Sequence, residues 1–586
     1  MQRPTFIRIV ALLTAAALSG LGGYFFLRFT GEGGLTALDL MRGVLVVLSG
    51  FWLVWGGSAA VMGVFVPTAK RSGDARLAPQ GMTAILVPIY NEDPVETFAR
   101  IAAMNRSLIT LGIAHKFHIA VLSDTQSMET AAQETIWFEQ LLHEPMSEGR
   151  IFYRRRERNT GRKAGNIEDF IARSGAAYDY AVILDADSLM EGETIGELAR
   201  RMDADADLGL LQTVPKIIRA RTLFGRAMQF SAGYLSPNFA RGAALMQGWE
   251  GPYWGHNAIV RVRAFAASCG LPELSGKPPF GGHILSHDYV EAALLSRAGW
   301  KVIVDPDLGG SYEEGPENLI EYAKRDRRWC QGNLQHRRLI SAPGLKLWSR
   351  FTFIQGIMAY LASPLWLMLF IASILAAIFP DRRPVWLPFN EPPLEMWVLG
   401  AAVATVLVLP KLMILIRGLV DGRNQRFGGT PRVFASIVSE IVLSTIMAPV
   451  MLLLQTRAVT QVLLGLDGGW PATKRGQNWI GMRAAIEASW WIVALGAVTL
   501  GGTAIFAPAI TVWVAPAMLP AILAPVLISW TSRPPRHERL SQIFRTDTEL
   551  VPTPVIKEFH AVVAAWTTND VVPELIVSRT TSYVPA

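Results

Sequence analysis

The chain has 586 residues, of which 51% are hydrophobic and only 18% are charged, and its mean hydropathy is +0.28. A soluble enzyme of this length would carry more charge, so the composition indicates a membrane protein. Two cysteines, Cys269 and Cys330, exclude a disulfide framework and a four-cysteine zinc site. The net charge of +7 is modest and no basic stripe carries interleaved aromatics, so we expect no nucleic-acid partner.

Two apolar segments, 9–27 and 41–66, open the chain, and each is long enough to cross a bilayer. Basic residues flank their outer ends, with Arg8 before the first segment and Lys70 after the second. Positive residues mark the cytoplasmic side of membrane segments, so we place the N-terminus and the following domain in the cytoplasm. We assign residues 1–69 to two N-terminal transmembrane helices.

Residues 70–350 have the polarity of a soluble α/β domain. Short apolar strands alternate there with helices, and we expect these strands at 82–89, 117–122, 151–153, 180–184 and 208–213. This alternation predicts a largely parallel sheet.

Polar residues follow three of these strands: Asn91, Asp124, and the pair Asp185 and Asp187. The carboxyl ends of parallel strands meet at one edge of a sheet, and ligands bind in the crevice beyond that edge. Two carboxylates separated by one residue can bind Mg²⁺ or Mn²⁺ through oxygen and leave coordination positions for phosphates. An acidic surface turn would explain the pair alone, but the three coincidences together favour a nucleotide site.

A second apolar block covers residues 351–530. We expect membrane spans at 353–379, 396–417, 487–507 and 509–530. The segment 433–466 is interrupted by Pro449 and by polar residues that include Glu440, so we favour a helix at the cytoplasmic interface over a plain span. Residues 531–586 form a cytoplasmic tail. Six spans with one interfacial helix fit this topology, and eight spans would fit it too.

Six short motifs occur in a particular order: Val87-Pro-Ile-Tyr-Asn91-Glu92, Ser123-Asp124, Lys163-Ala-Gly-Asn166, Asp185-Ala-Asp187, Ser286-His-Asp288 and Arg325-Asp-Arg-Arg328-Trp329. This set resembles the processive family 2 glycosyltransferases, which include cellulose and hyaluronan synthases. Residues 285–293 and 326–336 look like the branch that makes the backbone of osmoregulated periplasmic glucans. The resemblance implies a GT-A-type α/β cytosolic glycosyltransferase domain inserted between α-helical transmembrane segments of the cell inner membrane.

The resemblance implies seven residues that bind the nucleotide sugar: Asn91, Glu92, Asp124, Lys163, Asp185, Arg325 and Arg328. Asp124 would hold the uridine, although a solvated aspartate at a strand end is the simpler alternative. Lys163 would neutralise nucleotide charge, and Arg328 would clamp the pyrophosphate. Asp185 and Asp187 would bind Mg²⁺ or Mn²⁺ against the charge of the leaving UDP.

Asp288 would be the catalytic base, although a helix N-cap is the alternative for an aspartate at a helix start. The family motif is usually Thr-Glu-Asp, and here it is Ser-His-Asp with the aspartate retained. Inverting transfer needs one base opposite the leaving group. Tyr253, Trp254 and Trp329 would contact the acceptor, and Arg325 occupies the Gln position of the family motif Gln-x-x-Arg-Trp.

Trp470, Thr473 and Lys474 resemble a gating loop that closes over UDP, and an ordinary juxtamembrane loop is the alternative. The arginine-rich segment 325–328 has its own alternative as a basic helix at the membrane surface.

The resemblance thus implies an inverting enzyme that polymerises glucose from UDP-glucose into a growing β-1,2-linked glucan and exports it across the inner membrane. Its expected partners are inner membrane lipids, acyl carrier protein and periplasmic glucan-processing proteins. One alternative is another β-glucan synthase that makes β-1,4 or β-1,3 linkages. A second is a non-enzymatic membrane transporter or receptor with a nucleotide-binding domain.

Overall fold

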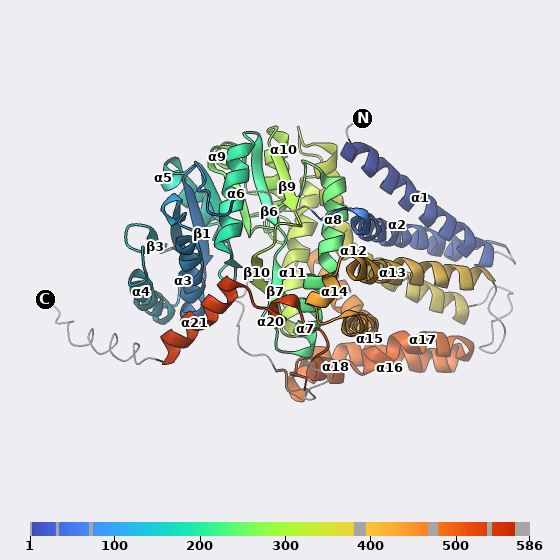
Figure 1. Ribbon diagram of the computed structural model, residues 1–586. Helices are drawn as coiled ribbons and strands as arrows, with labels where there is room; N and C mark the ends of the chain where they lie inside the picture. The colour runs from blue at the N-terminus through green and yellow to red at the C-terminus, as the bar shows by residue number, and fades with distance from the viewer. Residues whose placement is uncertain are drawn as a thin grey trace.

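The computed structural model describes residues 3–30, 34–68, 74–379, 394–466, 479–535 and 542–568. Within these residues an α/β domain stands beside a bundle of long helices (Figure 1). The three residues of the expected gating loop, Trp470, Thr473 and Lys474, lie outside the described residues.

The α/β domain is built on a seven-stranded sheet with the order β3-β2-β1-β4-β8-β6-β9. Its strands are β1 (Thr83–Ile89), β2 (Phe117–Ser123), β3 (Ile151–Arg155), β4 (Tyr180–Ile183), β6 (Leu208–Thr213), β8 (Ala258–Arg261) and β9 (Lys301–Asp305). Most neighbours pair in parallel, as the alternation predicts, but β8 runs antiparallel to both β4 and β6. Strands β8 and β9 were not predicted, because the alternation of strands and helices becomes irregular in the sequence after residue 213.

A smaller sheet of three strands has the order β5-β10-β7. Strand β5 (Leu189–Met190) comes directly after the Asp185–Asp187 turn and pairs with β10 (Ser311–Glu314), which also pairs with β7 (Lys216–Ile218). The smaller sheet therefore brings β10 to the edge at which β4 ends.

The core lies on both faces of the large sheet. In β1, Ile85 and Val87 face one apolar cluster while Ala84 and Leu86 face another, so the strand is buried on both sides. Helices α3 (Pro94–Thr110), α4 (Met128–Leu142) and α6 (Gly192–Ala204) supply the first cluster, and α5 (Arg162–Ser174), α9 (Val262–Ser268) and α10 (His287–Arg297) supply the second. Three more helices link the domain to the membrane block: α7 (Leu223–Phe230), α8 (Ser236–Gln247) and α11 (Leu319–Gln335).

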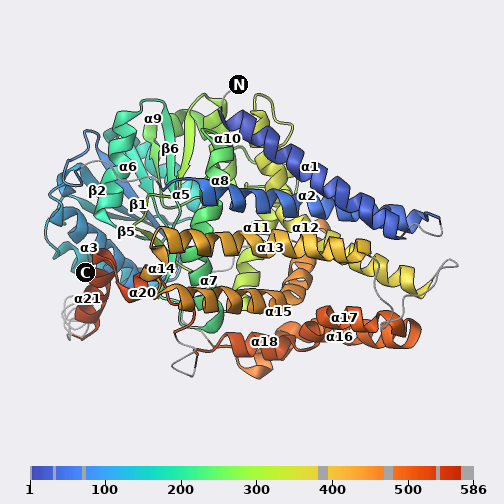
Figure 2. The same ribbon diagram turned by 45° about the vertical axis from the view of Figure 1, so that its right-hand side comes forward.

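The long apolar helices extend side by side away from the sheet domain in both views (Figures 1 and 2). They are α1 (Arg3–Thr30), α2 (Ala37–Phe65), α12 (Leu347–Ile378), α13 (Leu394–Val420), α15 (Thr430–Leu463), α16 (Met482–Phe506), α17 (Pro508–Ile522) and α18 (Ala524–Thr531), with the single turn α14 (Arg423–Arg426) between α13 and α15. By length and composition, six of the described helices can cross a membrane, or seven if α17 and α18 count as one broken span.

Two parts of the membrane block differ in detail from the predicted pattern. Helix α15 is continuous over 34 residues and is apolar enough to be a span, so its placement at the interface stays a prediction. The expected span 509–530 is divided into α17 and α18, which meet at an angle of 53°. Pro520 and Pro525 flank this bend, and proline removes a backbone donor that a straight helix requires.

The described part of the C-terminal tail returns to the α/β domain. After α20 (Asp547–Leu550), helix α21 (Pro554–Thr568) packs on α3, and Phe559 is fully buried in the first apolar cluster. The ring of Trp566 stacks on that of Trp137, with 5.4 Å between the ring centroids. The tail therefore follows the membrane block in the sequence but contributes to the core of the α/β domain.

Candidate active site

The predicted polar residues do lie at one edge of the sheet. Ile89 at the end of β1 is paired with Ser123 at the end of β2, and Leu86 is paired with Ile183 at the end of β4. Asn91, Asp124 and Asp185 therefore all follow these strands at the same side. Asn91 adopts a left-handed backbone conformation with φ of 54°, which asparagine tolerates better than most residues, and its side chain accepts a hydrogen bond from the Ser127 amide at 3.3 Å.

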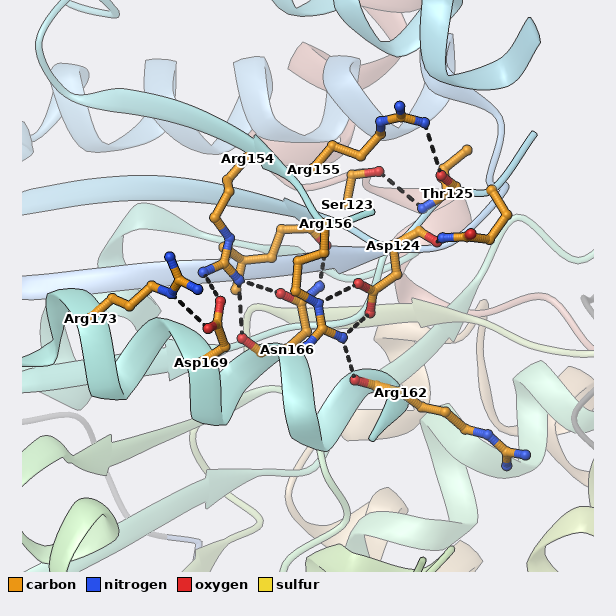
Figure 3. Close-up of polar contacts among 12 residues, drawn as sticks. Ser123, Asp124, Thr125, Arg154, Arg155, Arg156, Arg162, Asn166, Asp169 and Arg173 are labelled. Atoms are coloured by element: carbon orange, nitrogen blue, oxygen red, sulfur yellow. Dashed lines mark hydrogen bonds and ion pairs between the residues drawn. The ribbon is translucent and has the colours of Figure 1, made fainter. Parts of the chain in front are cut away.

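Asp124 lies in a bidentate ion pair with Arg156 (Figure 3). The Arg156 Nε and Nη2 groups donate to the two carboxylate oxygens at 2.7 and 2.8 Å, and the aspartate side chain is only 5% exposed. Arg156 reaches this position because β3 pairs with β2, with Arg155 opposite Ser123. A third hydrogen bond from Arg156, to the Arg162 carbonyl at 3.2 Å, fixes the guanidinium further. Asp124 is therefore a buried and oriented carboxylate, unlike the solvated strand-end aspartate of the alternative.

Sequence reasoning did not select Arg156. A signal was present, because three consecutive arginines stand at the end of a strand of the same sheet, where the other predicted site residues lie. The neighbouring Arg154 pairs with Asp169 on α5, and Arg155 donates to the Thr125 carbonyl at 3.3 Å. Only Arg156 of the three points at a predicted site residue.

Lys163 stands in the first turn of α5 and points at Asp185. Its ammonium group forms an ion pair with the Asp185 carboxylate and donates to the Gly255 carbonyl at 2.8 Å. The turn before it is tight: Gly161 has φ of +68°, and a Cβ on Gly165 would lie 2.3 Å from the Thr160 carbonyl oxygen. Glycines at these two positions therefore allow the close approach that aims Lys163.

The pKa of Asp185 is lowered. Burial acts in the opposite direction, but the positive charges of Lys163, His256 and Arg325 outweigh it. Its side chain remains 38% exposed, which leaves a carboxylate that is both ionised and accessible to a ligand.

The Asp185–Asp187 turn fits a hard divalent cation. The backbone amide of Asp185 donates to the Ser188 hydroxyl at 2.9 Å, which holds the turn, and Arg100 donates to the Ala186 carbonyl at 3.3 Å. The described residues hold no cluster of three or more His, Cys, Asp or Glu side chains arranged as metal ligands. Two carboxylates suit Mg²⁺ or Mn²⁺ when phosphate oxygens and water complete the coordination.

The loop before β8 reaches this edge because β8 is antiparallel to β4. Ala258 lies opposite Ile183, so Gly255 and His256 stand beyond the end of β4, close to Asp185. The His256 Nδ1 is 3.8 Å from the Asp185 carboxylate, and its Nε2 is 2.7 Å from Glu313 on β10. Burial lowers the pKa of His256, but the carboxylates of Asp185 and Glu313 prevail and raise it to about 9.

The two expected acceptor residues of this loop differ in exposure. Tyr253 is buried at 1% exposure and packs in the second apolar cluster, so its ring is part of the core. Trp254 is partly exposed, and its amide donates to the Gln212 side chain at 2.7 Å. Of the two, Trp254 is therefore the side chain that a ligand can reach.

Asp288 lies in the first turn of α10, next to Gly255. The helix N-cap is Ser286, so the alternative reading of Asp288 as the N-cap residue is wrong. Gly255 has φ of +86°, and a Cβ there would lie 3.5 Å from the Asp288 carboxylate. Burial, with a further contribution from Glu291, raises the pKa of Asp288 to about 6 against the lowering effect of His287.

Helix α11 supplies the arginine and tryptophan motif. The Arg325 guanidinium lies over the Trp329 ring, 4.5 Å from its centroid, and the Trp329 side chain is 41% exposed. The helix packs tightly on the start of α10, because a Cβ on Gly332 would lie 2.1 Å from the Ser286 hydroxyl. Arg327 points the other way and donates to Gln461 of α15 at 2.7 Å. Helix α11, which carries the motif, is thus attached to both α10 and the membrane block, which a free basic surface helix would not be.

Known proteins of similar sequence identify the family of the chain. The family model described as glycosyl transferase family 2 matches residues 84–268, and that of glycosyl transferase family group 2 matches residues 180–413. A glucans biosynthesis glucosyltransferase H from Cereibacter sphaeroides is 53% identical, with 99% of each chain covered. Relatives of the same name from Rhodopseudomonas palustris and Shewanella oneidensis are 38% and 39% identical, covering 94% and 89% of this chain and 79% and 73% of their own lengths.

Among solved structures, a mannosyltransferase from Pyrobaculum calidifontis in complex with GDP-Man and Mn²⁺ is 16% identical, with a TM-score of 0.43. It covers 65% of this chain and 98% of its own, a likeness too low to add to the assignment. The alternative of a non-enzymatic transporter or receptor is wrong, because the close relatives are glucosyltransferases. The chain belongs to the glucans biosynthesis glucosyltransferase H family within glycosyltransferase family 2, and it is a hexosyltransferase whose catalytic domain has a GT-A-like fold.

Proposed function

We propose that this enzyme transfers glucose from UDP-glucose, with inversion, to the end of a growing β-1,2-linked glucan and exports the product into the periplasm. One observation carries the proposal: Gly255 joins the donor and acceptor sides. Its carbonyl accepts a hydrogen bond from Lys163, which pairs with Asp185. Its Cα lies beside the Asp288 carboxylate. A base and a nucleotide-sugar site therefore meet on the two sides of one residue.

The donor binds along the edge formed by β2 and β4. Asp124 accepts a hydrogen bond from the uracil ring, and Arg156 holds the carboxylate in place for it. Asn91 and Glu92 border the nucleoside from the end of β1. Lys163 and Arg328 offset the negative charge of the diphosphate, Lys163 as a point charge and Arg328 through paired hydrogen bonds.

Asp185 and Asp187 hold Mg²⁺ or Mn²⁺, and that ion, when bound, stabilises the charge that builds up on the leaving UDP. Arg325 adds a cation on the same side, since its charge also lowers the pKa of Asp185. Asp185 thereby stays ionised in the presence of the donor.

Asp288 removes the proton from the acceptor hydroxyl as that oxygen attacks the anomeric carbon. The bond from this carbon to the UDP oxygen breaks on the opposite face, and the proton remains on the Asp288 carboxylate. A pKa of about 6 keeps the base ionised at neutral pH while making it a better proton acceptor than an ordinary aspartate. The exposed face of Trp329 and the partly exposed Trp254 position the acceptor sugar.

We also propose that the catalytic domain lies in the cytoplasm of a bacterium, with the helix bundle in the inner membrane. The basic residues flanking the apolar segments support this orientation. Contacts with acyl carrier protein and with periplasmic glucan-processing proteins are expected from the family resemblance alone.

The experiment that tests this function is transfer from labelled UDP-glucose by membranes that contain the protein, followed by linkage analysis. We expect a metal-dependent β-1,2-glucan, made only when UDP-glucose is the donor. A β-1,4 or β-1,3 product would assign the chain to another branch of glucan synthases. If no product forms from UDP-glucose but another nucleotide sugar is used, the donor assignment is wrong.

A further inference from the structure

Two buried polar side chains at the end of α11 face the loop that leads to Asp288. This loop, residues 281–286 and called the base loop below, stands directly before helix α10. Gln335 is the last residue of α11 and His336 is its C-cap, and their exposed fractions are 1% and 0%. The proposed mechanism uses neither residue. Because buried polar groups are normally held by hydrogen bonds, the partners of these two side chains indicate their role.

The Gln335 side chain bonds the backbone of the base loop in two places. Its oxygen accepts a hydrogen bond from the Leu285 amide at 3.0 Å, and its nitrogen donates to the His283 carbonyl at 3.3 Å. One side chain thus satisfies both a donor and an acceptor of the loop. It therefore fixes the course of the backbone shortly before Asp288.

His336 bonds the residue at which the base helix begins. Its Nε2 lies 2.9 Å from the carbonyl oxygen of Ser286, the N-cap of α10. A carbonyl oxygen can only accept, so Nε2 carries the proton. Burial lowers the pKa of His336 to about 4, which leaves the ring neutral with this one N–H group. The ring therefore donates this hydrogen bond at neutral pH without carrying a charge.

The end of α11 also packs closely on the base loop and on the membrane block. A Cβ on Gly332 would lie 2.1 Å from the Ser286 hydroxyl oxygen, so the α11 backbone lies directly against the N-cap. On its other side, the His336 ring packs on that of Phe353 in α12, with 4.8 Å between the ring centroids. The start of α10 is thus joined through α11 to a membrane helix.

We propose that Gln335 and His336 are positioning residues for the proposed reaction, which hold the base loop so that the Asp288 carboxylate faces the attacking hydroxyl. This inference rests on the proposed function, because it takes Asp288 as the base. A misplacement of about 1 Å at a reacting group can cost about 100-fold in rate, so the placement matters. The hydrogen bonds of both side chains end on the base loop, and donor binding should not depend on them.

Two substitutions separate the hydrogen bond of His336 from the packing of its ring. His336→Phe keeps an aromatic ring against Phe353 and removes the donor, whereas His336→Gln keeps an N–H donor near the position of Nε2 and removes the ring. We expect kcat to fall about 10- to 100-fold in His336→Phe and to recover largely in His336→Gln. The KM for UDP-glucose and the Kd for UDP should stay unchanged in both. If His336 only filled space in the core, His336→Gln would be the more damaging of the two.

The rate is measured on the full-length protein purified in detergent, and kcat is expressed per UDP-binding site counted by calorimetry. A variant that is merely unfolded in part loses sites and rate together, so its kcat per site stays at the wild-type value. His118→Phe is the matched control, because His118 hydrogen-bonds the Tyr178 hydroxyl at 3.0 Å near the start of β2, away from the base loop.

Gln335→Leu gives a second route if His336→Phe does not fold. Leucine removes both hydrogen bonds to the base loop at similar size, and we expect the same selective loss of kcat. A double substitution then tests whether His336 acts through Asp288. In Asp288→Asn the base is already absent, so adding His336→Phe should slow transfer no further.

Wild-type kcat per site in both His336→Phe and Gln335→Leu would overturn the inference. A further loss in the double variant, as large as in the wild-type background, would also overturn it, because His336 would then act independently of Asp288. The proposed function stands in both cases, since Asp288→Asn alone still slows transfer. If Asp288→Asn transfers glucose at the wild-type rate, the base assignment is wrong and the inference fails with it.

Discussion

The two halves of the proposed active site are built in different ways. The proposed donor half lies mainly on the ends of β1, β2 and β4, and its carboxylates are held by Arg156 and Lys163 of the same domain. The proposed acceptor groups Asp288 and Trp329 lie on α10 and α11, which pack on each other and on the membrane block, and α11 also carries the proposed donor residues Arg325 and Arg328.

The contact between α11 and the membrane helices is substantial. An apolar cluster joins the two: Cys330, Leu334, Tyr360, Ala458, Val459 and Val462. Arg327 adds polar contacts to Gln461 and to the Leu466 carbonyl at 2.7 and 2.9 Å. We infer that recognition of the nucleoside through Asp124 is a property of the α/β domain, whereas the acceptor position also depends on the membrane helices.

The largest effect should come from Asp288→Asn, which removes the base and leaves the donor half intact. We expect transfer to fall about 10³-fold, the usual contribution of a general base, with the affinity for UDP unchanged. Initial rates with labelled UDP-glucose and calorimetry with UDP measure the two halves separately. Asp207→Asn is the control, since that carboxylate is 77% exposed on the turn before β6. Transfer at the wild-type rate would rule out Asp288 as the base.

Arg156→Ala should affect the donor half alone. It removes both hydrogen bonds that orient Asp124 and leaves a buried carboxylate without its cation. We expect the KM for UDP-glucose to rise roughly 10- to 100-fold, in line with charge-assisted hydrogen bonds, and kcat to change less. Arg156→Lys should recover part of the loss. If KM were unchanged, Arg156 would have no part in nucleotide recognition.

The two halves should also differ in their response to pH. Asp288 acts when deprotonated and its pKa is raised to about 6, so kcat/KM should fall as the pH drops through 6, about tenfold for each further unit. Donor binding should stay nearly constant over the same range, because the pKa of Asp185 is lowered, the nearby cations outweighing its burial. Rate and binding profiles with UDP-glucose between about pH 5 and about pH 8 check this, because the range extends about 1 unit below and about 2 units above the expected change. A flat rate profile down to pH 5 would contradict it.

The smallest effect should come from Arg327→Ala, at the contact between α11 and α15. Losing these hydrogen bonds should lower transfer about threefold, the typical net value of such bonds, and leave UDP affinity unchanged. Arg173→Ala is the matched control, because Arg173 is 74% exposed and its ion pair within the described residues is with Asp169 on its own helix. A change in UDP affinity would show that the donor half is not independent of the membrane block.

Much of this molecule follows from local sequence. The buried run before Asp185 predicts both the strand and its position at a ligand edge, because an apolar segment ending in charges has few other stable arrangements. The same reasoning predicted the strands before Asn91 and Asp124. The long apolar segments likewise predicted the membrane helices, since span length is set by bilayer thickness. The family motifs added the chemistry expected of these residues.

Other features depend on which segments pair in space. Arg156 meets Asp124 only because β3 lies beside β2, and Gly255 meets Lys163 only because β8 runs antiparallel to β4. The docking of Phe559 on the core is of the same kind. The local pattern of residues does not show which distant segments will pair.

By itself, then, the sequence determined the class of protein, the membrane segments, and the carboxylates and cations available for glucosyl transfer. Only the tertiary structure decided which cation faces which carboxylate, that His256 lies 3.8 Å from Asp185, and that Tyr253 belongs to the core. The physical reason is that helix and strand formation reflect neighbours along the chain. Ion pairs and burial instead depend on distances between residues that are tens to hundreds of positions apart.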